Sequence, residues 1–243
     1  MRAWWAQTRA EVTMTLRRGE TLLLTIGIPV VLLLFFTAVR VTSTPTAHRV
    51  DFVAPGILAL CVLSTSLVAL SITTGYERSY GVLRRLHVTP LGRRRLVAAK
   101  MAGVGATEIL QVGVLAGVAA TLGWHPLGGA RAAIEALAVL VLGSAGCAGI
   151  GLALAGRLRA EVNLAAANGL YLLLLLFSGI VVPASSLPPV IQRVATALPS
   201  GALAEGLHRL FGSGAAPTGG DWVCLGLWAL AAPLVAARVF SFD

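Results

Sequence analysis

The sequence predicts an all-α integral membrane protein with six transmembrane helices. Of its 243 residues, 57% are hydrophobic and only 12% are charged, whereas a soluble domain carries roughly 25% charged residues. The apolar residues gather in six runs, each about long enough to cross a bilayer as a helix. The basic residues behind the formal charge of +9 lie mainly in short loops between these runs. That placement is typical of membrane topology rather than of a nucleic-acid-binding face, so we expect no nucleic-acid partner.

The chain opens with an amphipathic segment, residues 1–20. Trp5, Val12 and Leu16 fall on one stripe of a helix, with Arg9 beside it. This pattern predicts an interfacial helix anchored in the membrane surface by its indoles; the alternative is a partly ordered tail. We do not expect a cleavable signal peptide, because the first apolar run starts only near Thr21 and is long enough to span a bilayer.

The six apolar runs define one transmembrane domain that covers residues 1–243. The third and fourth runs carry small residues at four-residue spacing, which lets helices approach closely, either within the chain or between two chains. These are Gly113 and Gly117 in the third run, and Gly143, Cys147, Gly151 and Ala155 in the fourth. The predicted spans lie at about residues 21–39, 53–75, 101–123, 132–155, 163–182 and 221–240.

The distribution of basic residues predicts the orientation. Segments on the side of the N-terminus hold 14 Lys and Arg residues, and segments on the opposite side hold five. The positive-inside rule therefore places both termini and the loop 76–100 in the cytoplasm. No convincing repeat relates the two halves, which disfavours an inverted-repeat carrier.

Residues 183–220 separate the fifth and sixth spans and have a pattern of their own. Two apolar pieces, Pro188–Leu198 and Ser200–Phe211, flank Pro199. As helices, each would be about half as long as a bilayer is thick. We therefore expect two short helices that re-enter the membrane or lie on its surface.

The chain lacks the usual motifs of catalysis. A Walker A loop ends in Lys-Ser or Lys-Thr, but Lys100, the only lysine, is followed by Met101. The three cysteines lie inside apolar runs, and the four histidines are scattered over different loops, so neither set predicts a disulfide framework or a metal site. We expect no catalytic residue and no cofactor in this chain. Another subunit or an ion gradient would have to drive its work.

The central loop contains a charged segment, Glu77–Pro90, with the sequence ERSYGVLRRLHVTP. It is compatible with a helix over Glu77–Val88 that lies along the inner membrane face, with Glu77 in the first turn, where a carboxylate suits the helix dipole. Thr89-Pro90 is a stop signal. Such a helix with exposed leucines can dock in a groove of another protein, or the segment is a basic loop that binds lipid headgroups. The residues alone leave both interpretations open.

Two sequence signatures resemble those of the ABC type-2 permeases, the membrane subunits of ATP-binding-cassette exporters for drugs, lipids and polysaccharides. The first is the pattern Glu77-Arg78-x-x-Gly81-x-Leu83-Arg84-Arg85-Leu86-x-x-Thr89-Pro90, which is similar to the family's cytoplasmic signature. The second is Phe177–Pro183, followed by Ser186-Leu187-Pro188, Leu198-Pro199 and Glu205-Gly206-Leu207. It resembles the family's extracellular re-entrant segment. The resemblance covers essentially the whole chain, and its spacing is most similar to the daunorubicin-resistance-type drug-export branch.

The resemblance implies a role for the cytoplasmic signature. It would be a coupling helix that enters a cleft of a separate ATPase, and that ATPase would bind ATP and Mg²⁺. The N-terminal helix would support the same interface. The coupling residues would be Glu77, Arg78, Tyr80, Gly81, Leu83, Arg84, Arg85, Leu86, Thr89 and Pro90.

The resemblance also implies an outer gate, a pair of permeases and a location. Two copies, or this chain and a homologous permease, would form an efflux pathway in a bacterial cell membrane, surrounded by lipids, with antibiotic resistance as one outcome. The cargo would be a lipophilic small molecule, drug, lipid or glycolipid. The gate residues would be Gly179, Pro183, Leu187, Pro188, Pro199 and Glu205.

Glu108 and Gln111 are polar residues within the third predicted span. An ionisable group there costs roughly 2.5–3.5 kcal/mol on insertion scales, so it should face protein or water. Glu108 is either a polar point on the pathway of a cationic or polar substrate or a helix–helix hydrogen bond. Two other functions remain open: a gradient-driven carrier or channel, for which Glu108 is the one good candidate residue, and a non-transporting accessory protein.

Overall fold

The computed structural model describes residues 2–17, 19–39, 49–87, 92–180 and 188–240. These residues form helices and connecting turns, without a strand among them, so the predicted all-α class is confirmed. The helices are α1 (Arg2–Arg17), α2 (Gly19–Ala38), α3 (Arg49–Val62), the π-helix η1 (Leu63–Ala69), α4 (Leu70–Ser79), α5 (Val82–His87), α6 (Gly92–Thr121), α7 (Gly129–Ala155), α8 (Ala160–Phe177), α9 (Pro189–Ala197), α10 (Pro199–His208), the π-helix η3 (Arg209–Ser213) and α11 (Gly219–Val239).

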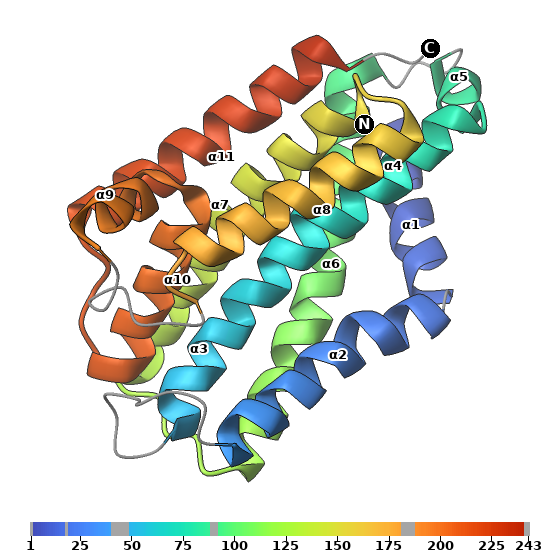
Figure 1. Cartoon of the computed structure of the whole chain (residues 1–243). Helices are drawn as coiled ribbons and strands as arrows, with labels where there is room; N and C mark the ends of the chain where they lie inside the picture. The colour runs from blue at the N-terminus through green and yellow to red at the C-terminus, as the bar shows by residue number, and fades with distance from the viewer. Residues whose placement is uncertain (1, 18, 40–48, 88–91, 181–187, 241–243) are drawn as a thin grey trace.

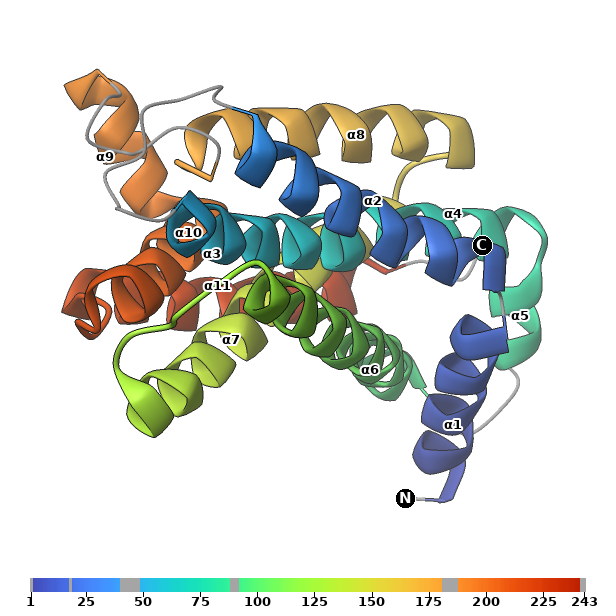
Figure 2. The ribbon, with the colours of Figure 1, turned by 90° about the horizontal axis from the view of Figure 1, so that it is seen from below.

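The long helices lie side by side between two ends of an elongated bundle (Figure 1). One end carries α1, α5 and the last turn of α11, and we call it the α5 end. The other end carries α9, α10 and the beginning of α3, and we call it the α10 end. The short helix α1 turns away from α2 and packs against α6, as the second view also shows (Figure 2).

Among the residues that the structure describes, five helical stretches are long and apolar enough to cross a membrane. One of them is the continuous run of α3, η1 and α4, and the other four fall in α6, α7, α8 and α11. The first predicted span corresponds to α2, whose stretch Leu23–Ala38 is apolar but shorter. Many large apolar side chains point away from the bundle on α8 and α11, among them Leu172, Leu176, Leu227 and Leu230. Such a surface suits contact with lipid.

Two clusters of buried side chains hold the bundle together. The larger one extends through the middle of the molecule to the α10 end and includes Leu58, Val139, Leu203 and Leu207. The smaller one lies at the α5 end and joins α4, α5, α6, α7 and α11. Its members are Leu70, Leu83, Leu96, Val97, Val104, Ala148, Leu152, Ala236 and Phe240.

The small residues of α7 pack inside the chain. A Cβ on Gly151 would lie 2.6 Å from the carbonyl oxygen of Leu67, so glycine permits the close approach of α7 to η1. Gly143 of the same stripe leaves space for the side chain of Leu203 of α10, whose Cδ1 would lie 2.8 Å from a Cβ at this position. By contrast, nothing among the described residues comes within 4 Å of a Cβ on Gly113 or Gly117 of α6. The two patterns looked alike in the sequence, and only the one on α7 has a partner here.

The predicted single helix over Glu77–Val88 is wrong. The second apolar run stays helical through Ser79, and the chain then turns at Tyr80–Gly81 before α5 begins at Val82. Gly81 has φ 71°, a conformation that glycine adopts at little cost. The end of the predicted loop 76–100 is helical as well, because α6 begins at Gly92. Packing of Leu96 and Val97 into the smaller cluster accounts for that early start.

The region between α8 and α11 contains two short helices, α9 and α10, on either side of Leu198. Their bounds agree closely with the two pieces expected around Pro199. Each helix starts with proline in its first turn, where the missing N–H has no partner to lose. Re-entry of these helices from the outer membrane face stays a prediction.

Candidate functional site

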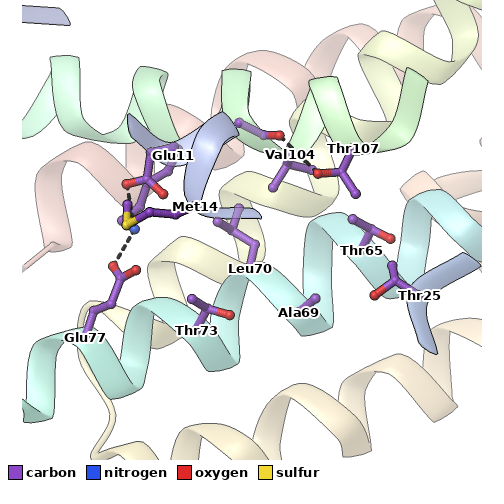
Figure 3. Close-up of a pocket in the computed structure, with 12 residues that line it drawn as sticks. Glu11, Met14, Thr25, Thr65, Ala69, Leu70, Thr73, Glu77, Val104 and Thr107 are labelled. Atoms are coloured by element: carbon purple, nitrogen blue, oxygen red, sulfur yellow. Dashed lines mark hydrogen bonds and ion pairs between the residues drawn. The ribbon is translucent and has the colours of Figure 1, made fainter. Parts of the chain in front are cut away.

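A buried ion triad joins three elements at the α5 end. Lys100 of α6 is 2% exposed, and its Nζ lies 2.5 Å from Oε2 of Glu77 in α4 and 3.2 Å from Oε1 of Glu11 in α1. The two carboxylates approach the ammonium group from different helices, as their positions in Figure 3 show. The carboxylate side chains are only 14% and 19% exposed, so little solvent screens the contact. The triad therefore attaches both the N-terminal helix α1 and the last turns of α4 to the helix α6.

Arg78, the neighbour of Glu77, makes a second contact at the same end. Its Nη1 donates to the carbonyl oxygen of Ala155 at 2.9 Å. Ala155 is the last residue of α7, where carbonyl groups lack helical partners and a cation interacts favourably with the helix dipole. The adjacent residues Glu77 and Arg78 thus bind to different helices, and α4 is held on two sides.

The turn at Tyr80–Gly81 sets which residues of the signature remain accessible. Tyr80 is 75% exposed and stacks on Tyr76, with ring centroids 6.1 Å apart. Val82 is 41% exposed, and the side chains of Arg84 and Arg85 are also exposed.

Leu83 corrects the expectation that the leucines of the signature are exposed for docking. It is 0% exposed and packs in the smaller cluster with Leu96 and Leu152. The turn at Gly81 directs α5 so that this side chain points inward. Of the remaining signature residues, Thr89, Pro90 and the side chain of Leu86 lie outside the described part of the structure.

A recess of about 90 Å³ extends from the ion triad into the bundle (Figure 3). It lies between α1, α2, α4 with η1, and α6, and four threonine side chains from three of these elements face it. Because hydroxyl groups bond readily to water, this lining is more polar than the surrounding apolar helices. The lining residues are Glu11, Met14, Thr25, Thr65, Ala69, Leu70, Thr73, Glu77, Lys100, Gly103, Val104 and Thr107.

Gln111 and Glu108, one turn apart on α6, have different surroundings. The amide of Gln111 is fully buried and donates to the carbonyl oxygen of Thr25, while its oxygen accepts from the Thr65 hydroxyl. Gln111 thereby joins α2 and η1 to α6 through side-chain hydrogen bonds, a contact that we call a polar clasp. Glu108 is 8% exposed and interacts with Ser144 of α7. Its Oε1 has no hydrogen-bond partner among the described residues.

A further polar clasp, which the sequence did not point to, joins α4 and α8. The Ser71 hydroxyl donates to Oδ1 of Asn163, and Nδ2 of Asn163 donates back to the Ser71 carbonyl, both at 2.9 Å. Gly75 lies one turn on and leaves space for the amide. Since the two residues are 92 positions apart, no local pattern predicts their pairing.

The predicted gate residues lie at the α10 end, where a recess of about 440 Å³ opens. Gly179 and Glu205 line it, Pro188 precedes α9, and Pro199 is buried at the start of α10. Burial and the neighbouring Asp221 raise the pKa of Glu205. Pro183 and Leu187 lie outside the described residues.

His208 connects α10 to the beginning of α3 at the same end. Its Nδ1 lies 2.8 Å from the Ala204 carbonyl oxygen, and its Nε2 lies 3.1 Å from that of Phe52. The imidazole also lies against the Phe52 ring, with centroids 4.6 Å apart and the ring planes tilted by 35°. Burial of the ring lowers the pKa of His208. Within the described part of the chain, no three His, Cys, Asp or Glu residues are grouped as they would be around a metal ion.

The residue that sequence reasoning missed is Lys100. Its one visible signal was that it is the only lysine among 19 basic residues and stands where an apolar run begins. Glu11, its partner from α1, is 89 residues away. Neither carboxylate could be assigned to it without the three-dimensional arrangement.

Comparison with known proteins agrees with the family that the two sequence signatures resemble. Residues 2–211 match the family described as ABC-2 type transporter. YvfS of Bacillus subtilis (strain 168), which its name assigns provisionally as a transport permease, is 25% identical over 213 residues, or 87% of this chain and 86% of YvfS. The resemblance to ABC type-2 permeases is confirmed, and the drug-export branch stays a prediction. With its apolar helices and the match over most of its length, the chain belongs to the ABC-2 type transporter family of multi-pass membrane proteins.

Proposed function

We propose that this chain is the permease subunit of an ABC exporter. It moves a lipophilic small molecule, drug or lipid out across the bacterial cell membrane, and a separate ATP-binding subunit supplies the energy. Family membership supports the association with an ATP-binding subunit. The apolar walls of the bundle and the small number of charged residues favour a lipophilic cargo.

The observation that carries this proposal is the ion triad of Lys100, Glu77 and Glu11. It makes α1, α4 and α6 one mechanical unit at the end of the bundle from which α5 projects. The bond of Arg78 to the end of α7 extends this unit to a fourth helix. A push on α5 is therefore transmitted to helices that cross the membrane instead of being absorbed in a flexible loop.

The surface that meets the ATPase is formed by Tyr80, Val82 and Arg85. Tyr80 and Val82 are apolar side chains with high exposure at a sharp turn, and the exposed Arg85 adds a charge that suits an acidic cleft. A short helix with exposed apolar anchors fits into a groove of a partner protein. In this arrangement Leu83 holds α5 on the bundle from behind.

The α5 end faces the cytoplasm and the α10 end faces outward in this proposal. The excess of basic residues on the side of the termini supports this orientation. A second copy of the chain, or a homologous permease, completes the pathway. The exposed apolar surface of α8 and α2 leaves room for such a partner as well as for lipid.

The test is ATP hydrolysis by the permease reconstituted in lipid vesicles with its ATP-binding partner. Glu77→Gln removes one charge of the triad, and we expect it to lower permease-stimulated hydrolysis and export while the permease remains in the membrane. Glu135→Gln is the matched control, because Glu135 pairs with the exposed Arg131 at the α10 end. Normal stimulation and export in Glu77→Gln would contradict the coupling role. Export that continues without the ATPase but follows an ion gradient would favour a carrier instead.

A further inference from the structure

Glu108 is a carboxyl group buried in the bundle, and no charged side chain among the described residues pairs with it. It lies in α6 and is 8% exposed. Its Oε1 is buried and has no hydrogen-bond partner among the described residues. The Ser144 side chain of α7 interacts with the carboxyl group, but a hydroxyl carries no charge.

Among the described residues, the groups that face Glu108 supply no positive charge. From α3, the nearby titratable group is the thiol of Cys61, and from α7 it is the thiol of Cys147. On α6 itself, Lys100 is eight residues away, or about 12 Å along the helix axis. Its ammonium group is already bound by Glu11 and Glu77. An ionised carboxylate at this position would therefore be buried without compensation, which is strongly unfavourable in a medium of low polarity.

Glu108 differs from Gln111, whose side chain serves to join helices by hydrogen bonds. Gln111 uses both its oxygen and its nitrogen to join α2 and η1 to α6. Glu108 leaves one oxygen unused, so packing alone does not explain a carboxyl group here. What a carboxyl group offers beyond an amide is the ability to bind and release a proton.

A recess reaches the residue next to Glu108 on α6, although Glu108 itself does not line it. Thr107, the preceding residue, lines the recess that begins at the ion triad, and Thr65 of η1 lines it as well. Next to Thr65, the hydroxyl of Ser66 bonds to the carbonyl of Val62 within the same helical run. The π-helix η1 interrupts the second apolar run at this level, and π-helical turns frequently occur at functional positions.

We propose that Glu108 is a proton-binding site that changes its protonation during the transport cycle. The carboxyl group holds a proton in the conformation described here. It releases the proton in a conformation in which the contact between α6 and α7 admits water. Because the two conformations bind the proton with different affinity, the equilibrium between them depends on pH. A lower pH favours the present conformation, and a higher pH favours the other. A change of protonation during transport rests on the proposed function, whereas protonation of Glu108 in the present conformation does not.

The first experiment detects the protonated carboxyl group directly. Dicyclohexylcarbodiimide is lipophilic and reacts with protonated carboxyl groups, so the permease with its ATPase in lipid vesicles is treated and its peptides are analysed by mass spectrometry. We expect modification at Glu108 that decreases as the pH rises, and none at this position in Glu108→Gln. Glu11 and Glu77 are internal controls, since ion-paired carboxylates should react little. Absence of modification at Glu108 would overturn the proposal.

The second experiment tests whether protonation changes in the cycle. The same labelling is performed without nucleotide and with ATP plus vanadate, and we expect at least a several-fold lower yield in the trapped state. The pH profile of stimulated ATP hydrolysis should flatten in Glu108→Gln and persist with a shifted midpoint in Glu108→Asp. Equal labelling in both states, together with an unchanged profile in Glu108→Gln, would show a fixed hydrogen-bonding role and contradict the proposal.

The two experiments also distinguish this inference from the proposed function. If the permease does not stimulate an ATPase, labelling still reports whether Glu108 is protonated in the membrane. If stimulation is normal but Glu108 is unmodified, only the proton-binding site is refuted.

Discussion

Oε2 of Glu77 lies 2.5 Å from Nζ of Lys100, which joins the last turns of α4 to the early part of α6 across the segment that contains α5. The two residues are 23 positions apart in the sequence, and their contact brings together the two ends of the segment between them. The helix that projects from this segment is thereby held by charge as well as by the packing of Leu83.

Lys100→Met should destabilise the permease strongly. The substitution leaves Glu11 and Glu77 close together without their cation, and removal of one partner from a buried ion pair costs about 3–5 kcal/mol. We expect a large fall in the midpoint of thermal or denaturant unfolding in detergent micelles. Arg131→Met is the matched control, because Arg131 is exposed in its pair with Glu135, and an exposed pair contributes only about 0–1 kcal/mol. Equal effects of the two substitutions would contradict the importance of burial at Lys100.

Leu83→Asp and Val82→Asp should have different effects although the residues are neighbours. Leu83 is fully buried, so a charge there should destabilise the fold by more than the roughly 2–5 kcal/mol of a Leu→Ala change. Val82 is exposed, so Val82→Asp should leave the unfolding midpoint nearly unchanged and weaken binding to the ATPase. Unfolding curves and co-purification with the ATPase measure the two effects. A stable Leu83→Asp protein would show that α5 does not pack as described.

Gln111→Leu should loosen the contact of α2 with the bundle. The change removes one hydrogen bond to the Thr25 carbonyl and one from the Thr65 hydroxyl. Hydrogen bonds between membrane helices contribute about 0.6 kcal/mol each on average, so we expect a loss of about 1 kcal/mol in an unfolding titration. Asn168→Leu should have little effect, because the exposed Asn168 amide donates only within α8. No difference between these two variants would argue against the clasp.

His208 should make the α10 end less stable as the pH falls. Burial lowers the pKa of His208, so the folded state favours the neutral ring and binds fewer protons than the unfolded state. The stability that this group contributes is present above the unfolded pKa of about 6.5 and is lost as the pH falls below it. The Glu205 carboxyl has the opposite shift, a raised pKa. Comparing the wild type with His208→Gln over a pH series cancels the contribution of Glu205, and parallel curves for the two proteins would refute the prediction.

Much of the fold was predictable because it depends on local composition. Apolar runs of sufficient length specify helices in a membrane, where every backbone group must be bonded within its own segment. Proline at Pro199 predicted the division between α9 and α10 for a similarly local reason. The signature around Glu77 predicted the family from the order and spacing of a few residues, and the family match agrees with it.

The sites depended on contacts that no local pattern contains. Glu11 and Lys100, or Ser71 and Asn163, are about ninety residues apart, so their pairing follows only from how the helices pack. The break at Gly81 was also hidden, since the segment on both sides of it is compatible with a helix. That break reversed the expectation for Leu83 by turning its side chain into the core.

The sequence by itself determined that the chain is helical, that it belongs in a membrane and that it is an ABC-2 type permease. Hydropathy and the spacing of the signatures are properties of residues that lie close together in the sequence, so they need no knowledge of the packing. The tertiary structure decided which polar residues are joined. It gave Lys100 its two carboxylates, used Gln111 to join three helices and left Glu108 without a counter-charge among the described residues. Within the apolar bundle, a polar side chain that has no partner in its own helix depends on what the neighbouring helices bring to it, and that is set by packing.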